Sequence, residues 1–232
     1  MMTLNNVAEV VRNKFLDRNV YFTDKELPTG FFVPDEWKDF GLSAESSSRF
    51  PSSWHLFVDE LPWVLSLLDL GLIGTAILDG DNIELLYIFH DVNGLYYYIG
   101  GLPLNMCSSN VDNLFPFKGK VSEFYYKVHN GFTFFPAQSM GPQKAEHFTC
   151  VADLIDEEDT DFASQWMTLL SNGAGDYLAV DLADSEANQG IIYWHEEPLN
   201  PEVGVSVFEV MDTWMSIFLE DTKPRADVIR YG

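Results

Sequence analysis

Apolar residues recur along the chain at two spacings, which predict both helices and strands. A spacing of three to four residues indicates helices, whereas short runs rich in β-branched and aromatic residues indicate strands. The predicted helices are 5–17, 54–70, 120–129, 144–156 and 204–219. The predicted strands are 72–78, 83–89, 95–99, 132–135, 166–170, 177–182 and 190–194. We therefore expect an α+β fold, mainly an antiparallel twisted sheet packed with helices.

Turn signals separate the first three predicted strands. Asp79-Gly80-Asp81-Asn82 lies between the first pair, and Asp91-Val92-Asn93-Gly94 lies between the second pair. Asn-Gly between two apolar runs is a strong hairpin signal. These strands therefore predict an antiparallel meander. Residues 19–50 are rich in Pro, Gly and Ser and are expected to be irregular.

The composition of 100–116 is typical of a linker and divides the chain. We expect an N-terminal region of helices and meander over 1–115, which is either an extension of the same sheet or a separate module. A second domain is expected over 116–222. The remaining residues, 223–232, are polar and are expected to be a frayed tail.

The most apolar stretch, 61–78, has the length of a membrane span. It contains Pro62, Asp69, Gly71 and Gly74, and a charge in mid-span is costly in a bilayer. We expect a buried helix that runs into a strand. The first six residues have neither a basic nor an apolar region of a signal peptide, and only Cys107 and Cys150 occur. These features predict a soluble protein of the reducing cytoplasm, without a membrane partner.

Carboxylates dominate the charge. The 13 Lys and Arg are outnumbered by 36 Asp and Glu, which gives a formal net charge of −23. Lys144 and Lys223 have no Lys or Arg between them, although that stretch contains eighteen Asp or Glu. Such a field repels nucleic acid and attracts basic proteins, whose association rate it raises about 10–1000-fold. We expect a protein partner with a basic surface, and no nucleic acid.

Three motifs were considered as sites of chemistry. Residues 172–175, Asn-Gly-Ala-Gly, superficially resemble a phosphate loop, but Asp176 and a strand follow where Lys and a helix are needed. His195-Glu196-Glu197 lacks the second His of a zinc-binding helix, and 156–161 lacks the spacing of a calcium loop. We expect that 172–175 form a hairpin tip, that 195–197 form a solvated strand end and that 156–161 form an acidic loop. We expect no cofactor and no metal.

No Ser/His/Asp or Cys/His set stands out among the titratable residues. The five His residues lack diagnostic neighbours. We therefore expect that the protein is not an enzyme and has no catalytic residues. An acidic hydrolase stays open as an alternative, because carboxylates are abundant enough to supply a glycosidase pair.

Four segments of the second half resemble the SUKH superfamily. They are SEFYYKVHNGFTFF (122–135), LLSNGAGDYLAVDL (169–182), GIIYWHEE (190–197) and SVFEVMDTWMSIFLED (206–221). Together they span about residues 118–221. That superfamily contains bacterial immunity proteins and yeast cell-wall synthesis regulators. The resemblance implies a SUKH-like fold and an immunity protein that occludes the active site of a cognate toxin.

The hypothesis that follows is an immunity protein for a basic, nuclease-type toxin domain. Acidic side chains that mimic phosphate and pair with toxin Arg and Lys are expected to carry it. They are Asp156, Glu157, Glu158, Asp159, Asp161, Asp184, Glu186, Glu196 and Glu197. A regulatory scaffold of the same fold is the alternative that keeps a binding role.

Overall fold

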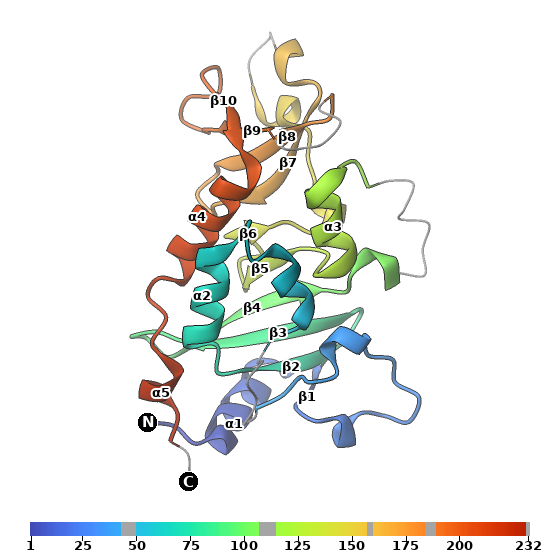
Figure 1. Ribbon diagram of the computed structural model, residues 1–232, viewed down its shortest axis with the longest axis vertical. Coiled ribbons are helices and arrows are strands. Elements are labelled where there is room, and N and C mark those ends of the chain that lie inside the picture. The colour runs from blue at the N-terminus through green and yellow to red at the C-terminus, as the bar shows by residue number, and fades with distance from the viewer. Residues whose placement is uncertain (43–49, 107–114, 157–159, 184–188, 231–232) are drawn as a thin grey trace. The chain divides into compact units, whose positions relative to one another are not determined.

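A computed structural model describes residues 1–42, 50–106, 115–156, 160–183 and 189–230 (Figure 1). It divides into two compact units. Unit 1 consists of Met1–Leu102 with Leu219–Gly232, and unit 2 is Pro103–Phe218. The chain thus leaves unit 1 within the predicted linker and returns to it at its end. With two antiparallel sheets and several helices, the protein is of the α+β class.

Unit 1 contains the predicted meander. Its elements are α1 (Leu4–Lys14), β1 (Asn19–Tyr21), α2 (Pro62–Gly71), β2 (Gly74–Asp79), β3 (Ile83–His90), β4 (Leu95–Gly101) and α5 (Arg225–Val228). The strands pair antiparallel in the order β1-β2-β3-β4. At the β3–β4 turn, Asp91 Oδ1 accepts hydrogen bonds from the backbone N–H groups of Asn93 and Gly94, at 2.6 and 3.0 Å. The side chain of Asp91 thus holds the turn that the Asn-Gly signal predicted.

The predicted helix over 54–70 is interrupted. Ser52–Phe57 forms a 3₁₀ helix, and α2 begins only at Pro62. Proline lacks an N–H group and restricts the residue before it, and Leu61 has a non-helical backbone with ψ of 49°. The apolar stretch 61–78 nevertheless passes from helix to strand as expected. Among the described residues, no helix has both the length and the apolar character needed to cross a bilayer.

Both ends of unit 1 contain regular structure that was not predicted. Within 19–50, β1 pairs with β2, and Asp24–Glu26 and Asp35–Trp37 form 3₁₀ helices. The C-terminal tail, which was expected to be frayed, is ordered as far as residue 230. Its helix α5 buries the side chains of Arg225 and Val228. Ile229 is also buried and bridges to Met2. The N- and C-terminal segments therefore stabilise each other through long-range contacts.

Unit 2 contains the second sheet. Its elements are α3 (Gly119–Lys127), β5 (Phe132–Phe135), β6 (Gly141–Pro142), β7 (Trp166–Ser171), β8 (Tyr177–Asp181), β9 (Gln189–Tyr193), β10 (Glu202–Ser206) and α4 (Val207–Leu219). Strands of the second sheet lie in the order β10-β9-β8-β7-β6, all antiparallel. Short 3₁₀ helices occur at Leu104–Met106, Ala145–His147, Val151–Leu154 and Asp161–Ala163.

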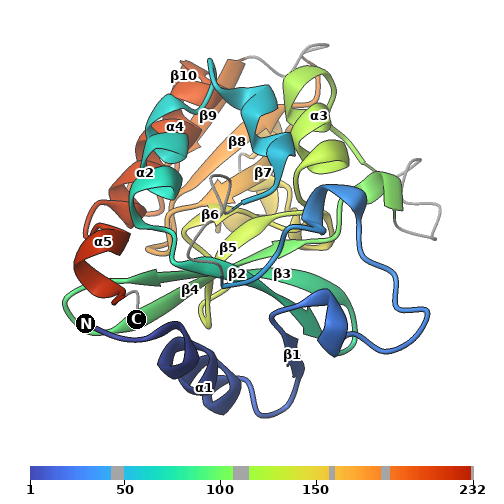
Figure 2. The ribbon, with the colours of Figure 1, turned by 60° about the horizontal axis from the view of Figure 1, so that its bottom comes forward.

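Different elements cover the two faces of the second sheet. On one face, Ala179, Ile191 and Tyr193 pack with residues of the 3₁₀ helices. On the other, α4 lies along the strands (Figure 2). Gly190 permits this approach, because a Cβ there would lie 2.8 Å from Leu178 Cδ1 and 3.2 Å from Val207 Cγ2. Alternation along each strand thus supplies two apolar faces.

The structure differs from the prediction in three parts of unit 2. The segment 144–156 contains two short 3₁₀ helices instead of one helix. Residues 141–142, which are not among the predicted strands, pair with β7 as β6. Strand β10 was not predicted, and α4 begins three residues later than expected. All five residues of β10 are at least partly exposed, so this strand has no apolar alternation to reveal it.

Candidate functional site

The structure describes four of the nine acidic residues predicted to bind a partner. Asp156, Asp161, Glu196 and Glu197 all have exposed side chains. Glu157, Glu158, Asp159, Asp184 and Glu186 lie outside the described residues. The candidate site therefore consists of residues from the described group and their neighbours.

Asp156 lies close to the ends of β8 and β9. It follows Ile155, which is buried in the core beneath the sheet, and the hydroxyl group of Tyr193 donates a 3.1 Å hydrogen bond to the Leu154 carbonyl oxygen. Burial raises the pKa of Tyr193, and the nearby charge of Asp156 raises it further. Tyr193 pairs with Tyr177 across the two strands. Asp156 therefore shares this end of the sheet with Asp176, the residue before Tyr177.

Asp176 and His195 connect the β7–β8 turn to the end of β9. Asp176 Oδ1 lies 2.7 Å from His195 Nδ1 and accepts the backbone N–H of His195 at 3.0 Å. Asn172 Nδ2 donates to Asp176 Oδ2 at 2.7 Å. Burial raises the pKa of Asp176, but the hydrogen bonds from His195 and Asn172 outweigh it, and the net effect is a lowered pKa. This carboxylate is a buried anchor.

Glycines allow the tip of the β7–β8 hairpin to meet His195. Gly173 and Gly175 have φ of +84° and +100°, which side chains rarely allow. A Cβ on Gly175 would also lie 3.1 Å from His195 Cγ. Asn172 Oδ1 accepts the N–H groups of Ala174 and Asp176, at 2.8 and 3.2 Å. The segment predicted as a hairpin tip is such a turn, and the turn is held by its own side chains.

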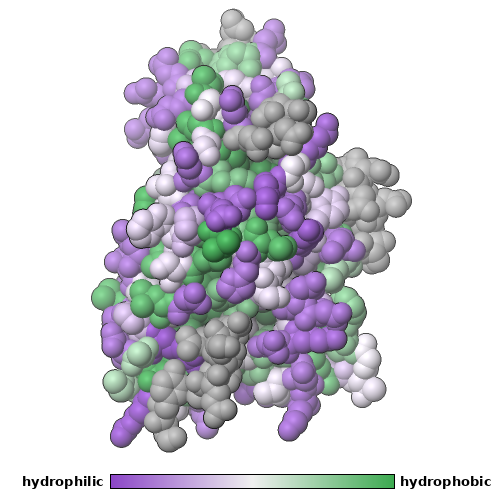
Figure 3. All heavy atoms as spheres, in the orientation of Figure 1, coloured by the Kyte–Doolittle hydropathy of each residue, from purple (hydrophilic) through white to green (hydrophobic). Residues whose placement is uncertain are grey.

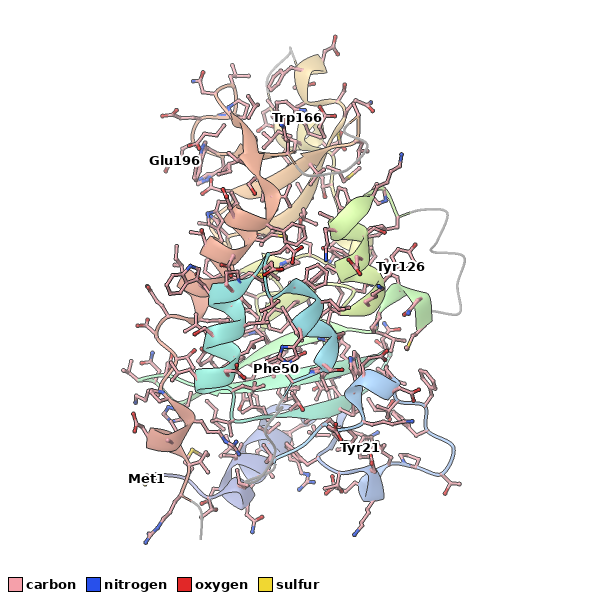
Figure 4. All side chains as sticks on the ribbon, in the orientation of Figure 1. Met1, Tyr21, Phe50, Tyr126, Trp166 and Glu196 are labelled. Atoms are coloured by element: carbon pink, nitrogen blue, oxygen red, sulfur yellow. The ribbon has the colours of Figure 1, made fainter. Side chains whose placement is uncertain are left out.

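Glu196 and Glu197 follow this anchor directly. The Glu197 N–H donates to the Trp194 carbonyl oxygen at 3.1 Å, and the Asn200 N–H donates to the Glu197 carbonyl oxygen at 3.0 Å. The ring of Trp194 lies 6.3 Å from that of Trp214 on α4. Figure 4 shows Glu196 projecting from the surface, and hydrophilic residues cover the corresponding part of Figure 3. The turn therefore presents both carboxylates to solvent from a fixed backbone.

Asp161 belongs to a different part of unit 2. It begins the 3₁₀ helix in which Phe162 packs against Trp166, with ring centroids 5.4 Å apart. Trp166 pairs with Asp181, whereas Ser171, at the other end of β7, pairs with Tyr177. Phe162 thus lies toward the end of β7 that is remote from Asp176. Asp161 is therefore not included in the candidate site, and its predicted role in partner binding stays a prediction.

We call Asp156, Asp176, Glu196 and Glu197 the carboxylate end of the second sheet. Asp176 is held by hydrogen bonds, whereas the other three are exposed. No Lys or Arg occurs from residue 145 to residue 222. Within the described part of the chain, no group of three or more His, Cys, Asp or Glu residues is placed to hold a metal ion. The surface is suited to attracting a cationic group from a partner.

The sequence analysis did not predict the contact between Asp176 and His195, because the two residues belong to separate motifs. Asp176 precedes β8 and His195 follows β9 at a separation of two residues. The pairing of Tyr177 with Tyr193, continued by one residue, places Asp176 opposite Trp194, the residue before His195. The available signal was this register, which depends on the length of the β8–β9 connection.

We predict that Asp176→Asn lowers stability at neutral pH by about 1–3 kcal/mol, the cost of disturbing a buried acceptor of charge-assisted hydrogen bonds. Because the pKa of Asp176 is lowered in the folded protein, its contribution is present above the unfolded pKa. It is lost as pH falls below about 4 through the folded pKa. Urea denaturation at several pH values measures this, and the variant and the parent should converge in acid.

The matched control is Asp153→Asn, at an exposed position of the same unit. It should change stability by less than about 0.5 kcal/mol. A constant difference between Asp176→Asn and the parent across the acid range would show that the charge of Asp176 is not what stabilises the turn.

Comparison with known proteins identifies no relative that has the carboxylate end. No family model matches the chain, and no match to it is found among curated proteins or solved structures. The role of the carboxylate end is therefore inferred from the exposure of Asp156, Glu196 and Glu197 and from the hydrogen-bonded Asp176 at the same end of the sheet.

Proposed function

We propose that the chain binds a cationic protein through the carboxylate end of its second sheet. The observation that carries this proposal is that Asp156, Glu196 and Glu197 are exposed at the end of the second sheet where Asp176 is anchored, in a stretch without Lys or Arg. More specifically, we propose an immunity protein that occludes the active site of a basic, nuclease-type toxin. The role is binding and not catalysis.

Electrostatics favours a basic protein over other partners. A nuclease cleft is lined with Lys and Arg that bind phosphate, and carboxylates form charge-assisted hydrogen bonds with the same groups. The net charge of −23 repels nucleic acid while it attracts such a cleft over several ångströms. An acidic surface therefore competes with the substrate of the toxin for its cationic residues.

The backbone beneath the carboxylates supports a pre-organised surface. Asp176 receives hydrogen bonds from both the backbone and the ring of His195, and the turn that follows is closed by the Glu197 N–H. A surface that is already ordered loses less conformational entropy when it binds. Glu196 and Glu197 thus approach a partner without a large ordering cost.

The SUKH resemblance supports the immunity role through the order of elements. Its four segments correspond to α3 with β5, the β7–β8 hairpin, β9 with the following turn, and α4. Gly131, within the first segment, has φ of +79° after α3. Two of the segments contain residues of the carboxylate end, namely Asp176 in the hairpin and Glu196 and Glu197 after β9.

We predict that this chain protects a cell from the toxin domain encoded in the neighbouring reading frame. Co-expression of the two in a sensitive bacterium should restore growth. The affinity of the purified pair should fall at least about tenfold from 0.1 M to about 1 M NaCl, which shortens the Debye length from about 10 Å to about 3 Å. Calorimetric titration in each salt measures this.

Expression of the toxin domain with an unrelated acidic protein of similar net charge is the control for non-specific neutralisation. Loss of protection by the chain itself would contradict the immunity role. Protection with an affinity that does not respond to salt would instead contradict the carboxylate end as the binding surface, because it would indicate an apolar interface.

A further inference from the structure

The two edges of the second sheet differ in their ability to accept another strand. The β6 edge consists of Gly141 and Pro142, both buried, and proline has no N–H to donate. The β10 edge has five residues, all at least partly exposed. In the described part of the chain, β9 is the one strand that pairs with β10 (Figure 1). An edge strand directs half of its backbone polar groups away from its neighbour.

The open edge carries apolar side chains. Val203 on β10 is 65% exposed, and Leu199 in the preceding loop is 52% exposed. Gly204, with φ of +75°, forms a bulge: Val203 pairs with Ile191 and Val205 pairs with Gly190. The bulge divides β10 into Glu202-Val203 and Val205-Ser206, each paired with β9. An added strand would therefore meet backbone groups together with apolar contacts.

The charge around this edge selects the occupant. Glu202 is exposed on β10, and Glu196 and Glu197 lie in the loop that joins β9 to β10. No Lys or Arg is present from 145 to 222 to balance them. A second copy of the chain would place like charges opposite each other, which is destabilising. A segment rich in Lys or Arg would pair with these carboxylates.

We propose that the cationic partner contributes an extended, Lys- or Arg-containing segment that adds to β10 as a sixth strand. Backbone hydrogen bonds supply affinity in this mode of recognition, and alternate side chains supply specificity. In this arrangement, every second side chain of the partner segment is a Lys or Arg that faces Glu202 and the β9–β10 loop. The apolar side chains between them face Val203. This inference rests on the proposed function and deepens it by naming the geometry of docking.

The test uses the full chain and a fluorescent peptide of about nine alternating Lys and Val residues, the length of an ordinary strand. We expect binding by fluorescence anisotropy and slower amide exchange in β10. Two further peptides carry N-methyl groups on alternate amides, one in each register. They keep every charge but lose the hydrogen-bond donors of one side, and at least one should bind at least about tenfold more weakly.

Val203→Pro supplies the test from the protein side, because proline removes an N–H and resists strand addition. It should weaken binding of the unmodified peptide by about tenfold or more. Its matched control is Val92→Pro in the β3–β4 turn, where Val92 is 78% exposed and remote from β10 in sequence. Circular dichroism establishes whether each variant is folded, and the methylated peptides give an answer that needs no variant.

The possible outcomes separate this inference from the proposed function. Equal binding of all three peptides would overturn strand addition. It would still be consistent with electrostatic binding to the carboxylate end. Absence of peptide binding would also overturn it, and the immunity role would still be judged by protection in cells. Sedimentation that shows a dimer abolished by Val203→Pro would overturn it as well, because β10 would then be occupied by a second copy.

Discussion

Glu196→Lys combined with Glu197→Lys is expected to weaken binding of the toxin domain by about 100-fold, and with it the protection in co-expression. Each substitution replaces an attractive contact with a repulsive one, at a cost of about 1–2 kcal/mol for an exposed interfacial charge, and every 1.4 kcal/mol is tenfold in affinity. The backbone of the turn is held by Asp176 and by the Glu197 N–H, so the fold should be retained. Calorimetric titration of the purified pair measures the change.

The control for this prediction is Glu9→Lys combined with Asp17→Lys. Both residues are exposed in unit 1, and the pair changes the net charge by the same amount. A purely long-range effect would weaken binding equally in the two double variants. Such equality would show that the overall charge, and not the carboxylate end, recognises the partner.

Trp54→Ala is expected to destabilise unit 1 by about 3–5 kcal/mol, as is typical when a large aromatic residue is removed from a core. Trp54 is 0% exposed, and its Nε1–H donates a 2.8 Å hydrogen bond to the buried hydroxyl group of Tyr87 on β3. The substitution creates a cavity and removes a donor from that hydroxyl group. Urea denaturation followed by far-ultraviolet circular dichroism measures the loss.

Trp63→Ala is the matched control, because Trp63 lies on α2 in the same unit and is 68% exposed. It should cost far less stability than Trp54→Ala. Equal losses for the two variants would contradict the assignment of Trp54 to the core. A third variant, Tyr87→Phe, separates the hydrogen bond from the cavity, since it keeps the ring and removes only the hydroxyl group.

Local pattern was sufficient for the meander of unit 1 and for its first helix. The meander over β2, β3 and β4 was predicted because apolar runs and the Asn93-Gly94 turn lie next to each other in the chain. The helix α1 was predicted for the same reason, and its first turn is capped by the side chain of Thr3. The absence of Lys and Arg from 145 to 222 is likewise a property of the sequence itself. Short-range sterics and hydrogen bonds determine such features.

Elements whose stability comes from distant residues were not predictable in this way. β1 is too short to show a period and forms by pairing with β2 some 60 residues later, as in the contact from Asn19 to Asp79. The helix α5 lies in a tail that the sequence presents as polar, and Ile229, just after it, is buried and bridges to Met2 near the N-terminus. The free energy that orders these segments is supplied by partners far along the chain.

The same division applies to the site. Its acidic character and the candidates Asp156, Glu196 and Glu197 follow from the sequence alone. Only the tertiary structure brings Asp176 to His195, separates Asp161 from the carboxylate end and leaves β10 as the open edge. Composition determines the sign of the field, whereas strand register and turn length determine where the charges stand.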